Sequence, residues 1–317
     1  AVPAVRNAVR TWLERYEAGD TVLVAVSGGA DSLALAHALS VESKEFVITV
    51  IGVTVDHQLQ EQSGAQAEKV VAQLKNFGLD CIIKKVNVDL KDGLEASARA
   101  ARYLALQEAV GEKSAVAVFL GHTRDDQAET VLLGLARGSG TRSLSGMAHH
   151  NGVYVRPLLE ITRNQSERYC EEVKLQYWSD PHNENPDFSR VRVRNVALPA
   201  LETSIGPGIS EALARSAHLL RDDADALDHW AKAEELALDL LNLDCAYLEK
   251  LPRAVRTRLI RAAIYAAGAP AGMVTMEHVS GVEALITAWS GQGALNLPGG
   301  VKVERISGRL SLLQHRP

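Results

Sequence analysis

Six consecutive residues near the start of the chain, Ser27-Gly28-Gly29-Ala30-Asp31-Ser32, have the composition of a phosphate-binding turn. The two glycines permit a tight turn and let a ligand approach the backbone N–H groups closely. The serine hydroxyls can donate hydrogen bonds, and the carboxylate of Asp31 can hold a metal ion. The segment is not a Walker loop, because no lysine follows the glycines at the required spacing. The alternative is an ordinary turn in which Ser or Asp caps the following helix.

Carboxylates and histidines form a second group of candidates. His122, Asp126 and Glu129 share a predicted helix start. Carboxylates three residues apart project from the same side of a helix, where like charges repel, so Asp126 and Glu129 are expected to bind Mg²⁺ or an ammonium group. The alternative for Asp125 and Asp126 is simple capping of the helix. His57 stands at the end of a predicted strand, where a histidine is more often structural than catalytic.

The elements that must position these residues alternate between apolar runs and helical patterns. Such alternation predicts βαβ units and a parallel, Rossmann-like α/β sheet, with ligands bound beyond the carboxyl ends of its strands. Polar clusters lie at three of these ends, at 27–32, 56–57 and 121–126. The predicted strands are Val22–Val26, Phe46–Val55, Cys81–Val88 and Ala115–Leu120, and the predicted helices between them are Ser32–Leu39, Gly64–Phe77 and Leu94–Val110.

The remainder of the sequence predicts a helical linker followed by a small α+β domain. The break at Gly206-Pro207-Gly208 ends a catalytic domain over 1–205 and begins a linker over 206–245. Residues 246–317 then form the small domain. The further predicted helices are Asp126–Arg137, Arg163–Lys174, Ile209–Leu243 (one helix or two end to end), Arg253–Ala267 and Met276–Thr287, and the further strands are Ala294–Leu297, Gly300–Val303 and Arg309–Leu313.

Arginines at two places in the predicted catalytic domain are candidates for binding phosphate. Arg99 and Arg102 lie three residues apart on one helical face, and a guanidinium there can face a phosphate or a leaving group. The alternative is an ion pair between Glu95 and Arg99 on a solvated helix. Arg190 and Arg194 follow a Pro- and Asn-rich loop that suits a flexible cover over a site.

The net charge of −5 does not by itself announce a nucleic-acid partner, but its distribution is uneven. Residues 251–317 hold eight Lys and Arg against three acidic residues, and Arg253, Arg256 and Arg258 lie close together within them. Such an asymmetry hints at a polyanionic partner. The alternative is an ordinary solvated helical face.

Cysteine usage and hydropathy indicate the compartment. Cys81, Cys170 and Cys245 lie far apart and no CxxC occurs, which argues against a disulfide framework, a zinc ribbon or an iron–sulfur site. No apolar run reaches the length of a membrane helix, and the N-terminus lacks the pattern of a signal peptide. We therefore expect a cytoplasmic protein without a membrane partner. A homodimer stays open.

The ordered set of motifs resembles the tRNA(Ile)-lysidine synthetase family, within the PP-loop ATPase superfamily. The glycine turn looks like the SGGxDS pyrophosphate loop, and the resemblance covers nearly the whole chain. One departure is Gln60, which stands where an arginine often follows the Asp-His pair. The other matching segments are Val55–His57, Glu95–Tyr103, Gly121–Thr130, Arg137–Gly140, Arg156–Leu159, Trp178–Asn183, Phe188–Arg194 and Leu297–Val301.

The resemblance implies a two-step reaction on the wobble cytidine of isoleucine tRNA with a CAU anticodon. The cytosine O2 attacks the α-phosphate of ATP and pyrophosphate leaves. The ε-amino group of free lysine then attacks C2 and expels AMP, which forms lysidine. ATP and Mg²⁺ are the implied cofactors, and tRNA and free lysine the implied partners.

The resemblance also implies roles for particular residues of this chain. These are, for ATP, Ser27, Gly28, Gly29, Ala30, Asp31, Ser32, His57 and His122; for the metal, Asp31; for catalysis, Asp31, Arg102, Asp126 and Glu129; for lysine, Asp126 and Glu129; and for tRNA, Arg190 and Arg194. The positive charge of residues 251–317 adds Arg253, Arg256 and Arg258 as candidates for contact with the tRNA backbone.

Three other functions compete with this one. A PP-loop tRNA thiolase would need reactive cysteines or a cluster, and an amidotransferase of the same superfamily would need a glutaminase with a nucleophilic cysteine. A nucleotide-dependent RNA-binding protein without catalysis would have no need to gather Asp31, Asp126 and Glu129 around a triphosphate. Pyrophosphate exchange that depends on tRNA separates an enzyme from such a sensor.

Overall fold

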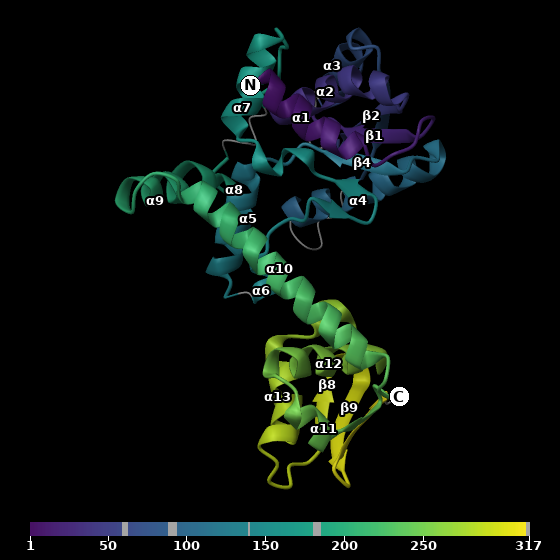
Figure 1. The fold of residues 1–317 in the computed structure, drawn as a ribbon, viewed down its shortest axis with the longest axis vertical. Helices are drawn as coiled ribbons and strands as arrows, with labels where there is room; N and C mark the ends of the chain where they lie inside the picture. Colours follow the sequence, from purple (N-terminus) through teal and green to yellow (C-terminus); the bar gives the residue numbers. More distant parts are fainter. Residues whose placement is uncertain (59–62, 88–93, 139, 180–184, 315–317) are drawn as a thin grey trace. The chain divides into compact units, whose positions relative to one another are not determined.

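The chain forms two compact units, residues 1–220 and 221–317, each with its own hydrophobic core. The domain boundaries expected at 205 and 245 stay a prediction. Three features singled out in the sequence lie outside the described residues: Gln60, Ser139 and the segment 180–183. The computed structural model (Figure 1) describes residues 1–58, 63–87, 94–138, 140–179 and 185–314.

A six-stranded sheet forms the centre of the first unit, in the order β3-β2-β1-β4-β6-β5. The edge strand β5 runs antiparallel to β6, and the other neighbours pair in parallel. The predicted α/β class and its four parallel strands are confirmed, with strand ends shifted by a few residues. The strands are β1 (Thr21–Ala25), β2 (Thr49–Asp56), β3 (Asp80–Lys85), β4 (Ala117–Leu120), β5 (His150–Asn151) and β6 (Tyr154–Val155).

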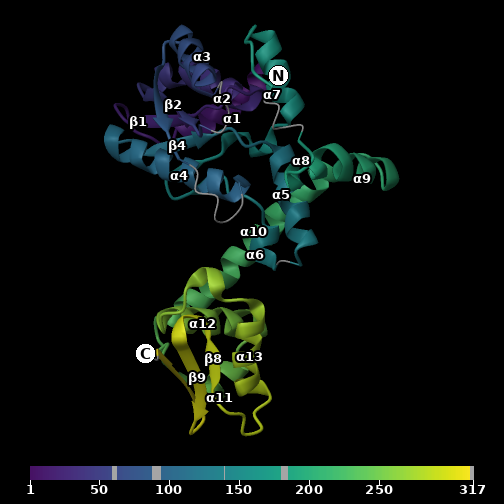
Figure 2. The same ribbon diagram turned by 180° about the vertical axis from the view of Figure 1, so that it is seen from behind.

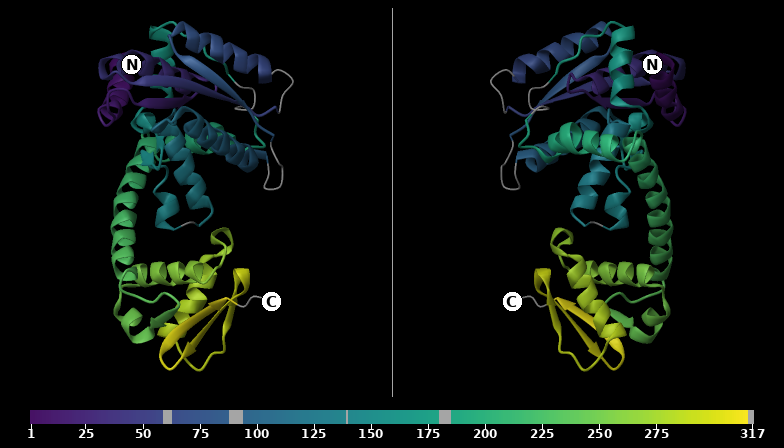
Figure 3. Two further views of the ribbon diagram at one scale, coloured as in Figure 1. Left: turned by 90° about the vertical axis from the view of Figure 1, so that its right-hand side faces the viewer. Right: turned by 90° about the vertical axis from the view of Figure 1, so that its left-hand side faces the viewer.

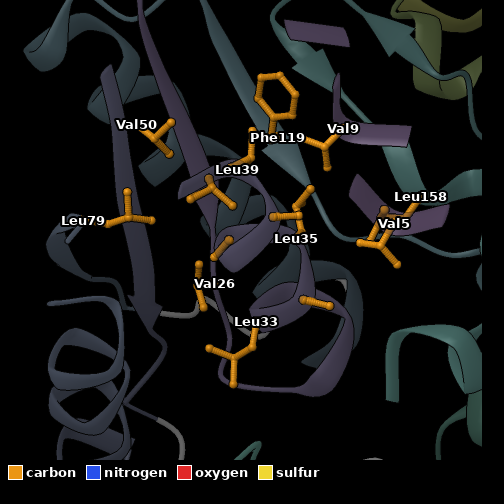
Figure 4. Close-up of a cluster of buried hydrophobic side chains, with 14 of the residues drawn as sticks. Val5, Val9, Val26, Leu33, Leu35, Leu39, Val50, Leu79, Phe119 and Leu158 are labelled. Carbon is orange, nitrogen blue, oxygen red and sulfur yellow. The ribbon is translucent and has the colours of Figure 1, made fainter. Parts of the chain in front are cut away.

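Helices cover both faces of this sheet (Figures 1 and 2). Successive residues of a strand point to opposite faces, so Val22 and Val24 of β1 pack with α1, α2, α3 and α7, whereas Leu23 packs with α4. Figure 4 shows Val9 of α1 and Leu39 of α2 near Phe119 of β4 in the first of these cores. The helices are α1 (Val2–Leu13), α2 (Ala30–Phe46), α3 (Ser63–Asn76), α4 (Leu94–Lys113) and α7 (Arg163–Glu172).

Shorter elements complete the first unit beyond β4. They confirm the predicted helix that carries the second group of carboxylates, and they show that the predicted cover ends in a helical segment with one π-helical turn, η4. These elements are α5 (Arg124–Ala136), α6 (Thr141–Leu144), the 3₁₀ turn η2 (Pro157–Glu160), α8 (Ser189–Arg192), η4 (Val193–Ala197) and α9 (Leu198–Ser204).

The second unit is a small α+β structure, as predicted (Figure 3). Its antiparallel sheet has the order β7-β10-β9-β8, and α12 and α13 share one core with it. The long predicted helix is a single helix, α10, and it ends at Glu235. Helix α10 (Ile209–Glu235) begins in the first unit and ends in the second. The other elements of the second unit are β7 (Asn242–Asp244), α11 (Cys245–Lys250), α12 (Arg253–Ala266), η5 (Ala271–Met273), α13 (Met276–Thr287), β8 (Leu295–Leu297), η6 (Pro298–Gly300), β9 (Val301–Ile306) and β10 (Arg309–Gln314).

The cysteines are free thiols held in apolar surroundings. Burial raises the pKa of Cys81 to about 11 and that of Cys170 to about 12, so neither is a thiolate near neutral pH. A reactive cysteine has a lowered pKa, which these two residues do not show. In the described part of the chain, no helix is both long and apolar enough to cross a lipid bilayer.

Candidate active site

The glycine turn joins β1 to α2, as predicted, and leaves the start of that helix open to a ligand. Gly29 is the residue before the helix, and no side chain caps the first N–H groups of α2. Ser32 closes the turn instead: its Oγ donates to the carbonyl oxygen of Gly29 at 3.0 Å and accepts from the N–H of Ser27 at 3.2 Å. An uncapped helix N-terminus carries partial positive charge and free N–H donors, which suits a phosphate.

Gly28 is the position in this turn where only glycine fits. Its φ of +91° lies in the left-handed region, which a side chain disfavours. A Cβ atom there would also come within 2.9 Å of Gln66 Nε2 and 3.0 Å of Val70 Cγ2 on α3. The backbone N–H of Trp178 donates to the carbonyl oxygen of Gly28 at 2.9 Å, so the predicted cover begins beside the turn.

The loops after β1 and β4 meet at the point where the strand order reverses. β1 lies between β2 and β4, so the chain leaves β1 and β4 toward opposite sides of the sheet. A Cβ atom on Gly121, just after β4, would lie 3.1 Å from the carbonyl of Asp31, so the two loops touch. The structure thereby brings Asp31 and the residues after Gly121 together at one site.

Asp31 occupies the first turn of α2, where its carboxylate faces the Ser166 hydroxyl, which favours the ionised form. Its Oδ1 is buried without a hydrogen bond to any described residue, and its Oδ2 lies 3.7 Å from Arg163 Nε. Burial, together with the nearby charge of Asp126, raises the pKa of the Asp31 carboxyl to about 7. A cation bound beside Asp31 would lower this pKa again, because an opposite charge favours the ionised carboxylate.

Asp126 and Glu129 share one side of α5, as their spacing predicts. Asp126 also caps the helix: its Oδ2 accepts from the N–H of Thr123 at 2.8 Å and from the Thr123 hydroxyl at 3.0 Å. Burial alone would raise the pKa of Asp126, but Arg163 and the Thr123 N–H outweigh it and hold the pKa below the usual value. Asp126 therefore caps the helix through Oδ2, while its Oδ1 lies beside the guanidinium of Arg163. Binding of Mg²⁺ or an ammonium group by Asp126 stays a prediction.

Two arginines supply positive charge to these carboxylates. Arg194 Nε donates to Glu129 Oε1 at 2.6 Å and its Nη2 donates to Oε2 at 3.1 Å, while the Glu129 side chain is 0% exposed. Arg163 Nη2 lies 3.1 Å from Asp126 Oδ1 and 3.5 Å from Glu129 Oε1. Arg163 thus contacts all three predicted catalytic carboxylates.

Sequence reasoning missed Arg163, which it used only to mark the start of a helix. One signal was present: Arg163 is the first residue of α7, where the helix dipole disfavours positive charge. An arginine at that position needs acidic neighbours from elsewhere in the fold. Arg163 has them in Asp31 and Asp126.

A cavity of about 190 Å³ opens beside Glu129 in the first unit. Its charged walls hold three acids and two bases, so it offers a place both for ammonium and for carboxylate groups. An amino acid zwitterion carries both kinds of group. The lining residues are Asp125, Glu129, Arg163, Arg194, Leu198, Pro199, Glu202 and Ser210.

His57, His122 and Arg102 form the other side of the site. The Nδ1 atoms of both histidines are buried without a partner among the described residues. Burial and the charge of Arg102 lower the pKa of both rings, to about 3 for His122, so both are neutral near pH 7. Arg102 itself has no ion pair with any described residue, although burial lowers its pKa.

The arginines predicted to contact tRNA differ in their surroundings. Arg190 Nη2 lies 3.4 Å from Thr130 Oγ1, so Arg190, like Arg194, points toward α5. In the second unit, Arg256 is only 8% exposed, and its Nη2 donates to Glu283 at 2.8 Å, which gives it a structural role. Arg253 and Arg258 are ion-paired at the surface, and their contact with tRNA stays a prediction.

A metal at this site would have to rely on few protein ligands. Across the described residues, no group of three or more His, Cys, Asp or Glu side chains is arranged to hold a metal ion. Mg²⁺ commonly binds through one or two carboxylates together with substrate phosphates and water. The unpartnered Oδ1 of Asp31, at the entrance of an uncapped helix, fits that pattern.

Comparisons with known proteins agree with this geometry. Residues 4–201 match the PP-loop domain family, and residues 243–311 match the TilS substrate binding domain. Fold and site together define a PP-loop ATP-binding protein.

Two relatives that align with most of the chain identify its family among the PP-loop proteins. A tRNA(Ile)-lysidine synthase from Thermobifida fusca is 50% identical over 312 residues, which cover 98% of this chain and 96% of the relative. One from Streptomyces coelicolor is 52% identical over 299 residues, which cover 92% and 85%. The chain belongs to the tRNA(Ile)-lysidine synthase family, whose members are ATP-dependent ligases of the PP-loop class, and the resemblance seen in the sequence is confirmed.

One solved structure shares this fold at low sequence identity. The tRNA thiolase NcsA from Methanococcus maripaludis superposes with a TM-score of 0.58 at 21% identity, over 68% of this chain and 78% of that one. At this identity the likeness concerns the fold alone.

Proposed function

We propose that the site converts the wobble cytidine of isoleucine tRNA to lysidine, with ATP and free lysine as its other substrates. The observation that carries this proposal is the meeting, at one strand-order reversal, of an uncapped helix start, an unpartnered Asp31 oxygen and a charged cavity beside Glu129. The first two suit a nucleotide polyphosphate, and the cavity suits an amino acid. The RNA substrate is inferred from membership of the tRNA(Ile)-lysidine synthase family.

In the first half-reaction, the glycine turn would hold the pyrophosphate part of ATP. The free N–H groups at the start of α2 would bind phosphate oxygens, and the helix dipole would favour their negative charge. Arg102, which lacks an acidic partner among the described residues, would stabilise charge that develops on the α-phosphate as the cytosine O2 attacks. The neutral rings of His57 and His122 would line the same side without adding charge.

Asp31 would hold Mg²⁺ through its unpartnered oxygen, with phosphate oxygens and water as the remaining ligands. When bound, the ion would neutralise negative charge on the phosphates. The position of Asp31 in the first turn of α2 fixes its carboxylate next to the N–H groups that bind those phosphates. Its ionised form, which the surroundings disfavour, would be stabilised by the ion.

In the second half-reaction, the cavity beside Glu129 would hold the lysine substrate. Arg194 or Arg163 would bind its carboxylate, and Asp125 or Glu129 its α-ammonium group. Glu129 is fixed by two hydrogen bonds from Arg194, so its orientation does not depend on the substrate. Holding lysine and the adenylated base together would supply much of the rate by proximity. The ε-amine then attacks C2, and AMP leaves.

The remaining partners follow from the same proposal. Reading a single loop base requires that it be unstacked and presented in a pocket, at a cost of a few kcal/mol. The segment from Trp178 to Arg194 begins at the glycine turn and ends at Glu129, so it borders both substrate places. Arg253 and Arg258 would contact the tRNA backbone. A cytoplasmic location and homodimer formation stay predictions.

The test is direct detection of the product. The protein is incubated with ATP, lysine and transcribed isoleucine tRNA, and the tRNA is digested and analysed by mass spectrometry. We expect the mass of lysine, less one water, to be added at the wobble cytidine. A protein that binds ATP and tRNA but shows neither this adduct nor tRNA-dependent pyrophosphate exchange would be a sensor, and the proposal would be wrong.

A further inference from the structure

A group of arginines and tyrosines lies next to the site on α4 and around β6. We refer to Arg99, Tyr103 and Arg156 as the Arg-Tyr-Arg cluster. The guanidinium groups of Arg99 and Arg156 each donate to the Tyr103 hydroxyl at 3.3 Å. Arg99 also lies over the Tyr103 ring, 5.0 Å from its centroid. Two cations are thus brought to one phenol oxygen.

The buried guanidinium of this cluster, that of Arg156, has no acidic partner among the described side chains. Its hydrogen bonds go to the Ala148 carbonyl and the Tyr103 hydroxyl, and neither group carries charge. Arg156 is 6% exposed, and its Nε is buried without a hydrogen-bond partner, although its Nη1 donates to the Ala148 carbonyl at 2.9 Å. Burying a cation without a counter-charge is costly, so such a group is expected to have an anionic ligand.

The three residues of the cluster differ in their exposure to solvent. Arg99 is exposed, Tyr103 is partly buried and Arg156 is buried. Arg102, on the same face of α4, lies within electrostatic reach of both His57 and His122. Tyr103 and Tyr154 pack edge to face with centroids 4.9 Å apart, which adds aromatic surface of the kind on which unstacked bases rest.

Two kinds of phosphate could meet these arginines, those of ATP and those of the RNA strand. In the proposed function, the glycine turn and Asp31 already hold the pyrophosphate part of ATP. An RNA strand that inserts one base must also bring the neighbouring backbone phosphate to the rim of the site. The exposed Arg99 and its aromatic neighbour fit that strand better than a small nucleotide.

We propose that Arg99, Tyr103 and Arg156 bind a backbone phosphate of the RNA next to the base that is modified. This inference rests on the proposed function, because it assumes that an RNA base enters the site. Arginine forks bind phosphate oxygens in pairs, and the Tyr103 hydroxyl adds a third donor. The contact would fix the register of the strand and so select which nucleotide reaches Arg102 and ATP.

The test measures binding of an anticodon stem-loop by fluorescence anisotropy, which does not depend on catalysis. A series of RNAs carries an uncharged methylphosphonate at one loop phosphate at a time. The variant is Arg99→Gln, which changes an exposed side chain. The matched control is Arg15→Gln, because Arg15 is also exposed and lies 4.0 Å from the centroid of the Trp12 ring, outside the site.

We expect Arg99→Gln to weaken binding of the unmodified RNA about tenfold, with Arg15→Gln near wild type. One methylphosphonate position should weaken binding to the wild type by a similar factor. At that position Arg99→Gln should add less than about twofold, because the partner charge is already gone. Arg156→Lys should show the same position dependence while keeping the buried charge.

Other results would overturn the inference. If the Arg99→Gln loss is the same at every methylphosphonate position, the cluster contacts no particular backbone phosphate. If RNA binding is unchanged and the KM for ATP rises about tenfold, the phosphate belongs to ATP. Failure of the proposed function would appear differently, as absence of the lysine adduct with the wild-type protein and unmodified RNA.

Discussion

Each unit of the molecule contains a buried glutamate held by two arginines, and the two cases differ in what surrounds them. Glu129 in the first unit accepts from Arg194 and faces Arg163, whereas Glu283 in the second unit accepts from Arg256 and Arg253. Both glutamates are at most 6% exposed. By sequence type alone the two contacts are alike.

The contact in the second unit is complete. Arg256 donates to Glu283 at 3.1 Å and 2.8 Å, and to the carbonyls of Glu249 and Leu251 at 3.3 Å and 3.0 Å. These bonds join α12, α13 and the end of α11. No side-chain atom of Arg256 or Glu283 is left buried without a partner among the described residues.

The contact in the first unit is itself satisfied, but the polar groups around it are not. Asp31, His57 and His122 keep buried atoms without protein partners, and a cavity opens beside Glu129. Buried polar atoms are normally satisfied, so several unsatisfied ones at the edge of a sheet indicate missing ligands. The comparison teaches that pairing alone does not distinguish a structural arginine from a functional one, whereas the unsatisfied atoms around it do.

The largest effect is expected from Asp31→Ala. It removes the carboxylate that would hold Mg²⁺ at the phosphates, and we expect formation of adenylated tRNA to slow by more than about a thousandfold. Single-turnover formation of adenylated tRNA measures it. A purified, folded Asp31→Ala protein that forms the adenylate at the normal rate would contradict the role of the glycine turn.

Glu283→Gln should act on stability and leave the chemistry alone. It leaves the Arg256 charge buried without its partner, which we expect to lower the free energy of unfolding by about 3 kcal/mol. Urea unfolding measures that change, and the adenylation rate per folded molecule should stay within about twofold of wild type. A large loss of rate in the folded protein would give this ion pair a functional role.

Arg163→Lys tests whether one guanidinium organises the three carboxylates. A lysine retains the charge but cannot place several donors at once toward Asp31, Asp126 and Glu129. We expect the overall rate to fall about thirtyfold with little loss of stability. Arg168→Lys, an exposed position on the same helix, is the control. Equal rates for both variants would refute the role of Arg163.

The pH dependence should follow Asp31. Because its pKa is raised to about 7, the fraction ionised, and with it the rate at limiting Mg²⁺ and ATP, should rise about fourfold from about pH 6.5 to about pH 8. The folded-state pKa exceeds the usual value, so the stability contribution of Asp31 is present below about pH 4 and lost as the pH passes about 7. Asp31→Asn should therefore stabilise the protein by on the order of 1 kcal/mol at about pH 8, as measured by thermal unfolding. A rate that stays constant between about pH 6.5 and about pH 8 would contradict the raised pKa of Asp31.

Local patterns in the sequence predicted the fold and half of the site. The apolar runs at β1, β2 and β4 and the glycine turn are local features, and their order along the chain predicts one sheet edge. The pair Asp126 and Glu129 followed from helical spacing. Arg163 did not, because its partners lie on α2 and α5, and no local pattern joins them. Arg256 was predicted to contact tRNA because the sequence shows its charge but not its burial. Its contact with Glu283 depends on the packing of α12 on α13, which no local pattern reveals.

The most direct measurement is the amount of adenylated tRNA trapped in a single turnover by Asp31→Asn and by Glu129→Gln, each with lysine present. Asp31 lies at the ATP phosphates and Glu129 beside the lysine cavity, so the two variants should fail at different steps. We predict that Glu129→Gln accumulates adenylated tRNA, while Asp31→Asn forms almost none. Accumulation by Asp31→Asn, or none by a folded Glu129→Gln, would contradict the assignment of ATP to the glycine turn and lysine to the cavity.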